Sequence, residues 1–353
     1  MDTASAHLAR LGAHSRPTGG AAAADARAYC AATLRGLGFA ISEHSFEYSA
    51  FPGAYAAPAF GLAIPTLATL VFGSRHTSLA WVAVAVAIAI LWLLVRGTGP
   101  RAVLDGPLMR RVGTNLQAVR GTEAPRVWLV AHIDSKWQPV SMIARVAGVA
   151  TLGVGLVVLA IAAVVRPTVA PVALGLVGLG AIPLVLSVVG DGNDGTLDNA
   201  SGVAAVLEAV SRVPLDLALG VLIADAEELA LAGARAWARS ASPPAVALNC
   251  DSVDDEGTLV VMYTRAKPVR LTEALDTAAA KAGEPLRTLR LIPGILTDSV
   301  ALADAGWESV TLSRGTIRTL QRIHTARDTL AGMRGTGIAG AARVLALAAT
   351  ELS

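Results

Sequence analysis

The chain has 353 residues, of which 54% are hydrophobic and only 16% are charged. Soluble globular proteins have about one quarter charged residues, so we expect part of this apolar excess to lie in lipid. The formal net charge is +2 and no basic run is interleaved with aromatic residues, which excludes a typical nucleic-acid-binding protein. The two cysteines, Cys30 and Cys250, have neither CxxC nor metal-ligand spacing, and we expect two buried free thiols.

The first part of the chain predicts a helix over 20–37 and a strand over 39–48. Two segments without any charged side chain follow, at 54–73 and 78–95, and only four residues separate them. Each has about the length that crosses the hydrocarbon core of a bilayer. Trp81 and Trp92 lie near the ends of the second segment, where interfacial aromatic residues are favoured.

Two short strands are expected next, at 115–120 and 127–132, and the second is apolar up to its final histidine. A second pair of charge-free segments follows at 146–165 and 170–190, again separated by four residues. Each pair therefore predicts a helical hairpin that enters a membrane and returns. Buried core helices of a soluble protein are the alternative, but four such segments in two pairs favour a membrane.

The rest of the chain alternates between helices and strands. Helices are expected at 198–213, 229–239 and 271–282 and at the C-terminal end, and strands at 217–224, 246–250, 258–263 and 309–313. Such alternation predicts an α/β fold, a mostly parallel mixed sheet between helices, with two inserted transmembrane helical hairpins. The expected division is a discontinuous domain made of 1–53, 97–142 and 191–353, with hairpins at 54–96 and 143–190.

Because both hairpins return, we expect the rest of the chain to lie on one side of the bilayer. The opposite side would carry only Arg75 and Arg166 in its short loops. The near side carries more basic residues close to the spans: Arg96, Arg101, Arg110, Arg111, Arg120, Arg126, Lys136 and Arg145. The positive-inside rule then predicts an integral, multi-pass membrane protein with its soluble domain in the cytoplasm. A folded domain brings arginines to either side, so an exterior location is the alternative.

Histidine and acidic residues follow several expected strands, and each has an ordinary explanation when it is considered alone. Asp198 could cap a helix, and Glu227 and Glu228 could be acidic residues in the first turn of a helix. The joint pattern places a larger set at successive strand ends: His132, Asp134, Asp198, Glu227, Glu228, Asp251, His324 and Asp328. Zinc and related divalent metals bind to such a set of His, Asp and Glu.

Five motifs in chain order resemble those of the co-catalytic two-zinc aminopeptidases. This is the family of aminopeptidase Y and aminopeptidase S, and its clan, MH, also includes the glutaminyl cyclases. The motifs are Ala131-His-Ile-Asp-Ser135, Asp198-Asn-Ala-Ser-Gly-Val203, Ala226-Glu-Glu-Leu229, Asn249-Cys-Asp251 and His324-Thr-x-x-Asp328. Arg16-Pro-Thr-Gly-Gly20 and Thr297-Asp-Ser299 look like further parts of the same domain.

The resemblance implies two zinc ions, bound by residues from all five motifs. His132 and Asp251 would bind one ion, Glu228 and His324 would bind the other, and Asp198 would bridge both. Cobalt or manganese could also bind to such ligands.

The resemblance also implies a reaction, the removal of the N-terminal residue from a peptide or protein by a metallo-aminopeptidase. The two expected hairpins would anchor this enzyme in a membrane. Glu227 would be the general base that activates the metal-bridging water, and Asp134 would orient a histidine ligand. The expected partners are therefore peptide or protein N-termini and the lipid bilayer.

Two other functions remain open on the same scaffold. Glutaminyl-peptide cyclisation is one, because the run from His132 to Lys136 resembles the cyclase form of its motif. The Asp198 motif has the peptidase form, however, and Ile323 stands where cyclases usually carry Trp. The other function is a non-catalytic membrane receptor or scaffold, although such relatives typically lose metal ligands and this chain has every one expected.

Overall fold

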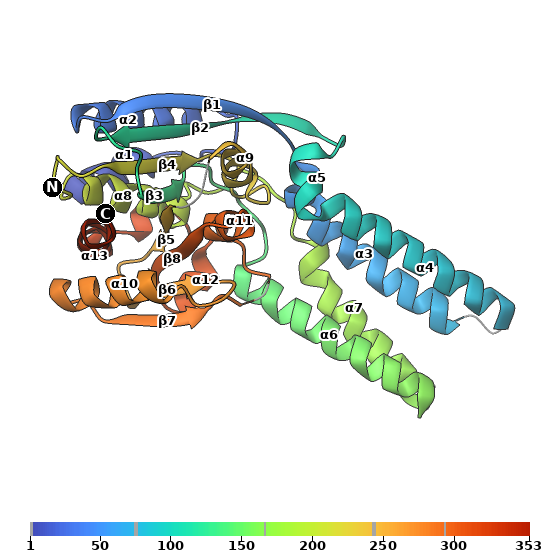
Figure 1. Ribbon diagram of the computed structural model, residues 1–353. Coiled ribbons are helices and arrows are strands. Elements are labelled where there is room, and N and C mark those ends of the chain that lie inside the picture. Colours follow the sequence, from blue (N-terminus) through green and yellow to red (C-terminus); the bar gives the residue numbers. More distant parts are fainter. Residues whose placement is uncertain (1–2, 74–76, 166, 242–244, 293) are drawn as a thin grey trace. The chain divides into compact units, whose positions relative to one another are not determined.

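The computed structural model describes residues 3–73, 77–165, 167–241, 245–292 and 294–353 (Figure 1). Contacts between residues divide the chain into two compact units. We call Met1–Tyr48, Arg110–Trp137 and Asp191–Ser353 the sheet unit, and we call Ser49–Met109 and Gln138–Gly190 the helical unit.

The sheet unit contains an eight-stranded sheet in the order β1-β2-β4-β3-β5-β8-β6-β7. Strands β3, β4, β5 and β8 run parallel to their neighbours within that group, and β6 is parallel to β7, whereas the β2–β4 and β6–β8 pairs are antiparallel. The strands are β1 (Ala40–Ser49), β2 (Arg110–Arg120), β3 (Val127–His132), β4 (Leu219–Ala224), β5 (Val246–Val253), β6 (Thr258–Tyr263), β7 (Leu286–Arg290) and β8 (Glu308–Gly315). The predicted α/β fold with a mostly parallel mixed sheet is confirmed.

Helices cover the central strands on both faces, which explains why every residue of β3, β4 and β5 is buried. On one face, Trp128 and Val130 of β3 pack with Trp237 of α9 and Leu302 of α11. Side chains alternate along a strand, so Leu129 faces the other way, where α8 and α13 contact β3. The helices of this unit are α1 (Thr3–Leu11), α2 (Ala21–Gly36), α8 (Ser201–Val210), α9 (Ala232–Ser240), α10 (Val269–Ala282), α11 (Asp298–Asp304), α12 (Ile317–Arg322) and α13 (Thr336–Leu352).

The described part of the helical unit contains five α-helices and one short 3-10 turn, Pro167–Val169. The α-helices are α3 (Phe51–Gly73), α4 (Thr77–Thr98), α5 (Pro100–Asp105), α6 (Met142–Val164) and α7 (Ala170–Val185). Helix α3 contacts both α4 and α7, and α6 runs alongside α7 (Figure 1). Many of their apolar side chains point outward, including Leu93, which is 61% exposed, and Val157, which is also 61% exposed.

Two described helices are long and apolar enough to cross a membrane by length and composition alone, Phe51–Phe72 and Met142–Val164. The apolar stretches Val84–Thr98 and Ala170–Val185 are shorter. Core helices of a soluble protein can pass the same test, so the four predicted spans are not established. The predicted loop arginines, Arg75 and Arg166, and the side chain of Trp81 lie outside the described residues.

Helix α7 ends earlier than the expected segment, which extended to residue 190. Ser187 donates its backbone N–H to Leu184 O at 3.0 Å and its hydroxyl to Pro183 O at 2.7 Å. These bonds tighten the last turn and satisfy carbonyl groups that a continuing helix would use. The helix thus ends in a tightened turn within a sequence that remains apolar.

Candidate metal centre

Two groups of buried side chains, each able to hold a metal ion, share one residue. The first group is His132, Asp198 and Asp251, and the second is Asp198, Glu228 and His324. Within each group, the candidate ligand atoms all lie within 4.8 Å of one another. Five residues from distant parts of the sequence therefore converge at one place.

Asp198 lies between the two histidines. Its Oδ1 is 3.1 Å from His132 Nε2, and its Oδ2 is 2.9 Å from His324 Nε2. The two oxygens of one carboxylate thus face different candidate ligands, which is the arrangement expected of a bridging carboxylate.

A short turn over Thr196–Ala200, in which Asp198 has non-helical backbone angles, carries this carboxylate. The side chain of Asp328 holds the turn, because it accepts hydrogen bonds from Leu197 N at 2.6 Å and Asp198 N at 3.1 Å. The helix expected from residue 198 accordingly begins only at Ser201.

Asp134 connects the end of β3 with the loop after β4. His132 Nδ1 lies 3.1 Å from the backbone oxygen of Asp134 and 3.5 Å from its Oδ1. The carboxylate of Asp134 also accepts hydrogen bonds from Glu227 N at 3.0 Å, Glu228 N at 3.2 Å and Thr18 Oγ1 at 3.1 Å. One buried carboxylate therefore fixes the backbone of both adjacent glutamates.

The two glutamates of that loop have different surroundings. Glu228 Oε1 lies 3.1 Å from His324 Nε2, and Glu228 Oε2 forms an ion pair with Lys136 Nζ at 2.6 Å. Glu227 belongs to neither group of ligands, although its Oε2 is 3.9 Å from His132 Nε2. Glu228 is thus a candidate ligand, whereas Glu227 lies beside the candidate ligands.

Asp251 lies on β5, where a register shift interrupts the pairing with β8 between Cys250 and Val253. Its Oδ1 is 3.7 Å from His132 Nε2 and accepts a hydrogen bond from Ser252 Oγ at 3.0 Å. The strand therefore leaves its regular pairing at Asp251, whose carboxylate lies in the site.

The buried cluster contains more acidic than basic groups, and the charges interact strongly. Burial raises the pKa of Glu227 well above its ordinary value, and the charges of Glu228 and Asp251 add to the rise. Burial alone would lower the pKa of His132, but the surrounding carboxylates, Glu227 foremost, raise it well above its ordinary value. Burial opposes ionisation of Asp198 as well, but its contacts with the two histidines outweigh burial and lower its pKa. The site therefore favours a bound cation.

The residues fit zinc. Imidazole nitrogens and carboxylate oxygens are its usual ligands in proteins, together with thiolates. Glu228 Oε1 is buried and lies 3.1 Å from His324 Nε2. An imidazole nitrogen and a carboxylate oxygen at this separation can both point to a shared ion.

Sequence reasoning assigned no role to Asp298 or Lys136. Asp298 is fully buried, and neither of its carboxylate oxygens has a hydrogen-bond partner among the described residues. Burial raises its pKa to about 7, and the charges of Asp134 and Asp251 contribute. In the sequence, Asp298 belongs to the Thr297-Asp-Ser299 motif, to which the family resemblance gave no function. Lys136 is adjacent to a motif, but only the fold shows that it reaches Glu228.

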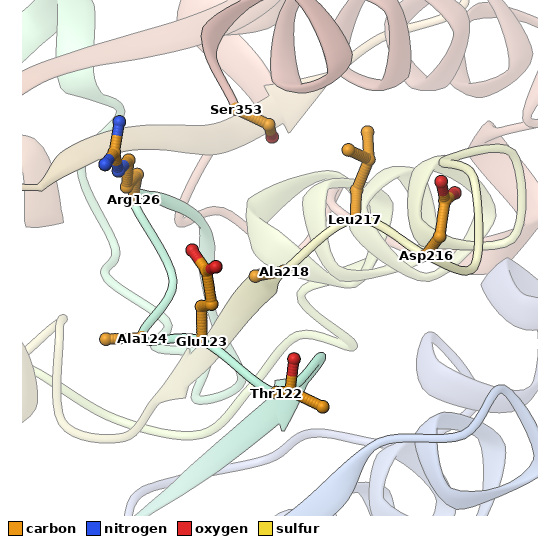
Figure 2. Close-up of a pocket in the computed structure, with 8 residues that line it drawn as sticks. All are labelled: Thr122, Glu123, Ala124, Arg126, Asp216, Leu217, Ala218 and Ser353. Atoms are coloured by element: carbon orange, nitrogen blue, oxygen red, sulfur yellow. The ribbon is translucent and has the colours of Figure 1, made fainter.

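A pocket of about 360 Å³ lies at the amino ends of the central strands, away from the candidate metal centre (Figure 2). Its lining residues are Thr122, Glu123, Ala124, Arg126, Asp216, Leu217, Ala218 and Ser353. Arg126 directly precedes β3 and Ala218 directly precedes β4, whereas the candidate ligand His132 ends β3. The pocket and the candidate metal centre are therefore separate features of the sheet unit.

Solved structures and one family model are similar to this chain. No curated protein sequence matches the chain. Among solved structures, it is similar to an aminopeptidase from Aneurinibacillus sp. strain AM-1, with 15% identity, a TM-score of 0.59 and coverage of 98% of this chain and 92% of that one. A zinc aminopeptidase from Bacillus subtilis has 13% identity, a TM-score of 0.61 and coverage of 99% and 94%.

A glutaminyl cyclase from Porphyromonas gingivalis is also similar, with 17% identity, a TM-score of 0.60 and coverage of 100% of this chain and 98% of that one. At these identities the structures share a fold. The sequence itself matches peptidase family M28 over residues 115–349, which is more than half of the chain. The chain therefore belongs to peptidase family M28.

Proposed function

We propose that this protein is a zinc-dependent aminopeptidase, anchored in a membrane by its helical unit, that removes the N-terminal residue of peptides or proteins. The observation that carries the proposal is the position of Asp198, whose two oxygens lie 3.1 Å from His132 Nε2 and 2.9 Å from His324 Nε2. Such a carboxylate can serve two neighbouring metal ions.

In this proposal, His132 and Asp251 would hold one zinc ion, Glu228 and His324 would hold the other, and Asp198 would contact both. Bound zinc supplies Lewis acidity, which polarises the scissile carbonyl group and lowers the pKa of water. Asp134 keeps the ligands in place through its contacts with His132 and with the backbone at Glu228. Groups that orient ligands in this way are a regular part of metal sites.

Glu227 is the proposed general base. It is buried beside the ligands without being one of them, and its backbone N–H is fixed by Asp134 at 3.0 Å. Its carboxylate would take a proton from the attacking water and deliver that proton to the nitrogen of the leaving amine. The excess of carboxylates around it also suits a substrate with a free, positively charged α-amine.

The proposed membrane anchor is the helical unit, with the sheet unit in the cytoplasm. The membrane anchor is supported by the outward-facing apolar surface of α4 and α6, where Leu93, Val157 and Ile161 are more than half exposed. Exposed apolar patches of this extent are unusual on soluble monomers. Lipid would cover them.

Hydrolysis of aminoacyl-p-nitroanilides and of short peptides with free N-termini, by detergent-purified, zinc-loaded protein, tests this function. The wild type is expected to release N-terminal residues, and Glu227→Gln is expected to lose this activity while its metal content stays unchanged. Peptides with acetylated N-termini serve as the substrate control. Absence of hydrolysis by the zinc-loaded wild type would contradict the proposal.

Glutaminyl cyclisation is the second candidate, favoured by the cyclase-like run from His132 to Lys136. Incubating the same zinc-loaded protein with peptides that begin with glutamine separates the two reactions. Cyclisation releases ammonia and forms a pyroglutamyl peptide, whereas hydrolysis releases free glutamine.

A further inference from the structure

Lys136 forms an ion pair with a candidate metal ligand. Its Nζ lies 2.6 Å from Glu228 Oε2, and the two side chains are only 14% and 4% exposed. Surface ion pairs are screened by water, but a largely buried pair holds its geometry more firmly, since removing one partner leaves an uncompensated buried charge.

The two oxygens of Glu228 are thereby committed to different partners. Oε2 faces the ammonium group of Lys136, whereas Oε1 faces His324 Nε2 at 3.1 Å. A carboxylate can bind a metal ion through one oxygen or through both. The ion pair with Lys136 draws Oε2 toward the ammonium group and favours binding through Oε1.

The main chain at Lys136 is itself held in place. Asn193 Nδ2 donates a hydrogen bond to Lys136 O at 3.0 Å. The next residue, Trp137, packs so closely on Gly192 that a Cβ atom at Gly192 would lie 3.1 Å from its indole ring. Contacts on the main chain and on the neighbouring side chain therefore fix the point from which the lysine side chain extends to Glu228.

We propose that Lys136 is a positioning residue that restricts Glu228 to a single bond, through Oε1, to the metal ion held with His324 and Asp198. This inference rests on the proposed metal site. Catalytic zinc sites keep a coordination position open for water or substrate, whereas structural sites are closed by protein ligands. A Glu228 side chain that binds through Oε1 alone would leave one more position on this ion for water or substrate.

Cobalt-substituted protein tests the inference, because visible absorption bands of cobalt weaken strongly when its coordination number increases. The variants are Lys136→Met, which removes the charge at similar length, and Lys136→Arg, which keeps it. Lys281→Met is the matched control, since Lys281 forms an exposed ion pair with Glu351 at 3.6 Å. An Asp251→Asn background weakens the other ion site, so that the spectrum mainly reports the ion near Glu228.

Lys136→Met is expected to reduce the cobalt absorbance several-fold as Glu228 binds through both oxygens, whereas Lys136→Arg and Lys281→Met are expected to keep the wild-type spectrum. Equal spectra for Lys136→Met and the wild type would overturn the inference. If Lys136→Met does not fold, a weakened spectrum in Lys136→Arg would overturn it, since the charge is retained there. Failure of the proposed function is seen separately, as a wild type that binds no metal or hydrolyses no peptide.

Discussion

Asp134 joins three segments that are far apart in the sequence. It contacts His132 beside it, Thr18 near the N-terminal end, and the backbone N–H groups of Glu227 and Glu228. A carboxylate suits this position because it accepts hydrogen bonds at both oxygens, and all four partners can present donors to it.

Asp134→Asn is expected to weaken metal binding and activity, because the amide group would turn one donor toward a backbone N–H group. Partners of metal ligands typically contribute about 10- to 100-fold in affinity or activity, and we expect a loss of this size. Zinc titration and kcat/KM of the purified variant measure it. Glu43→Gln, in an exposed ion pair with Arg27, should leave both unchanged. A variant with wild-type affinity and activity would show that Asp134 has no positioning role.

The sequence identified the residues of the site better than it identified their contacts. His132, Glu228 and Asp251 converge because the carboxyl ends of the parallel strands β3, β4 and β5 meet at one edge of the sheet. Asp198 and His324 join them from a turn before α8 and a turn after α12. The ion pair between Lys136 and Glu228 could not be predicted, since nothing in the spacing indicates where a long flexible side chain ends. The isolation of the Asp298 carboxylate likewise depends on tertiary packing.

At the scale of elements, predictions from apolar runs were accurate and predictions near the site were less so. The strands at 127–132 and 258–263 have the expected bounds. The helix expected at 198 begins at Ser201, because Asp328 holds the preceding turn in a non-helical form. Short amphipathic elements such as β7 and α11 were not predicted, since too few residues show their periodicity.

The close approach of α6 and α7 depends on small residues. A Cβ atom at Gly180 of α7 would lie 2.3 Å from Leu152 N and 2.7 Å from Gly148 O of α6. Gly175, on the same helix, has no atom within 4 Å of the corresponding position. The two glycines therefore form a matched pair for mutation.

Gly180→Ala should separate the two helices and destabilise the helical unit by about 1–3 kcal/mol, the usual cost of overpacking. Gly175→Ala should be neutral or stabilising by up to about 1 kcal/mol, because alanine favours a helix. Thermal unfolding of both variants in the same detergent measures the difference. Equal unfolding temperatures for the two variants would contradict the observed helix contact.

At the scale of the whole molecule, the chain combines an M28 sheet unit with an apolar helical unit. The composition indicated such a second part, because a 16% share of charged residues is low for a soluble protein. Composition does not establish that the helical unit crosses a membrane, since core helices of soluble proteins can have the same length and apolar composition.

The proposed topology predicts that a cysteine placed at residue 75 is labelled from outside intact cells by a membrane-impermeant maleimide. The native thiols should not interfere, because Cys30 and Cys250 are buried, and burial raises the pKa of Cys30 to about 12. A cysteine at Asp276 in the sheet unit is the control that should be labelled only after lysis. Reversed labelling of the two positions would place the sheet unit outside, and release of the protein by alkaline washing would contradict a membrane anchor.

The most direct test of the central claim is the zinc content of the purified protein after loading and desalting, measured by mass spectrometry. The account predicts two zinc ions per chain in the wild type and in Glu227→Gln. It predicts one ion in Asp251→Asn, and a severe loss of both in Asp198→Asn, because Asp198 alone belongs to both groups of ligands. A wild type that binds no zinc, or an Asp198→Asn variant that retains two ions, would contradict a metal centre bridged by Asp198.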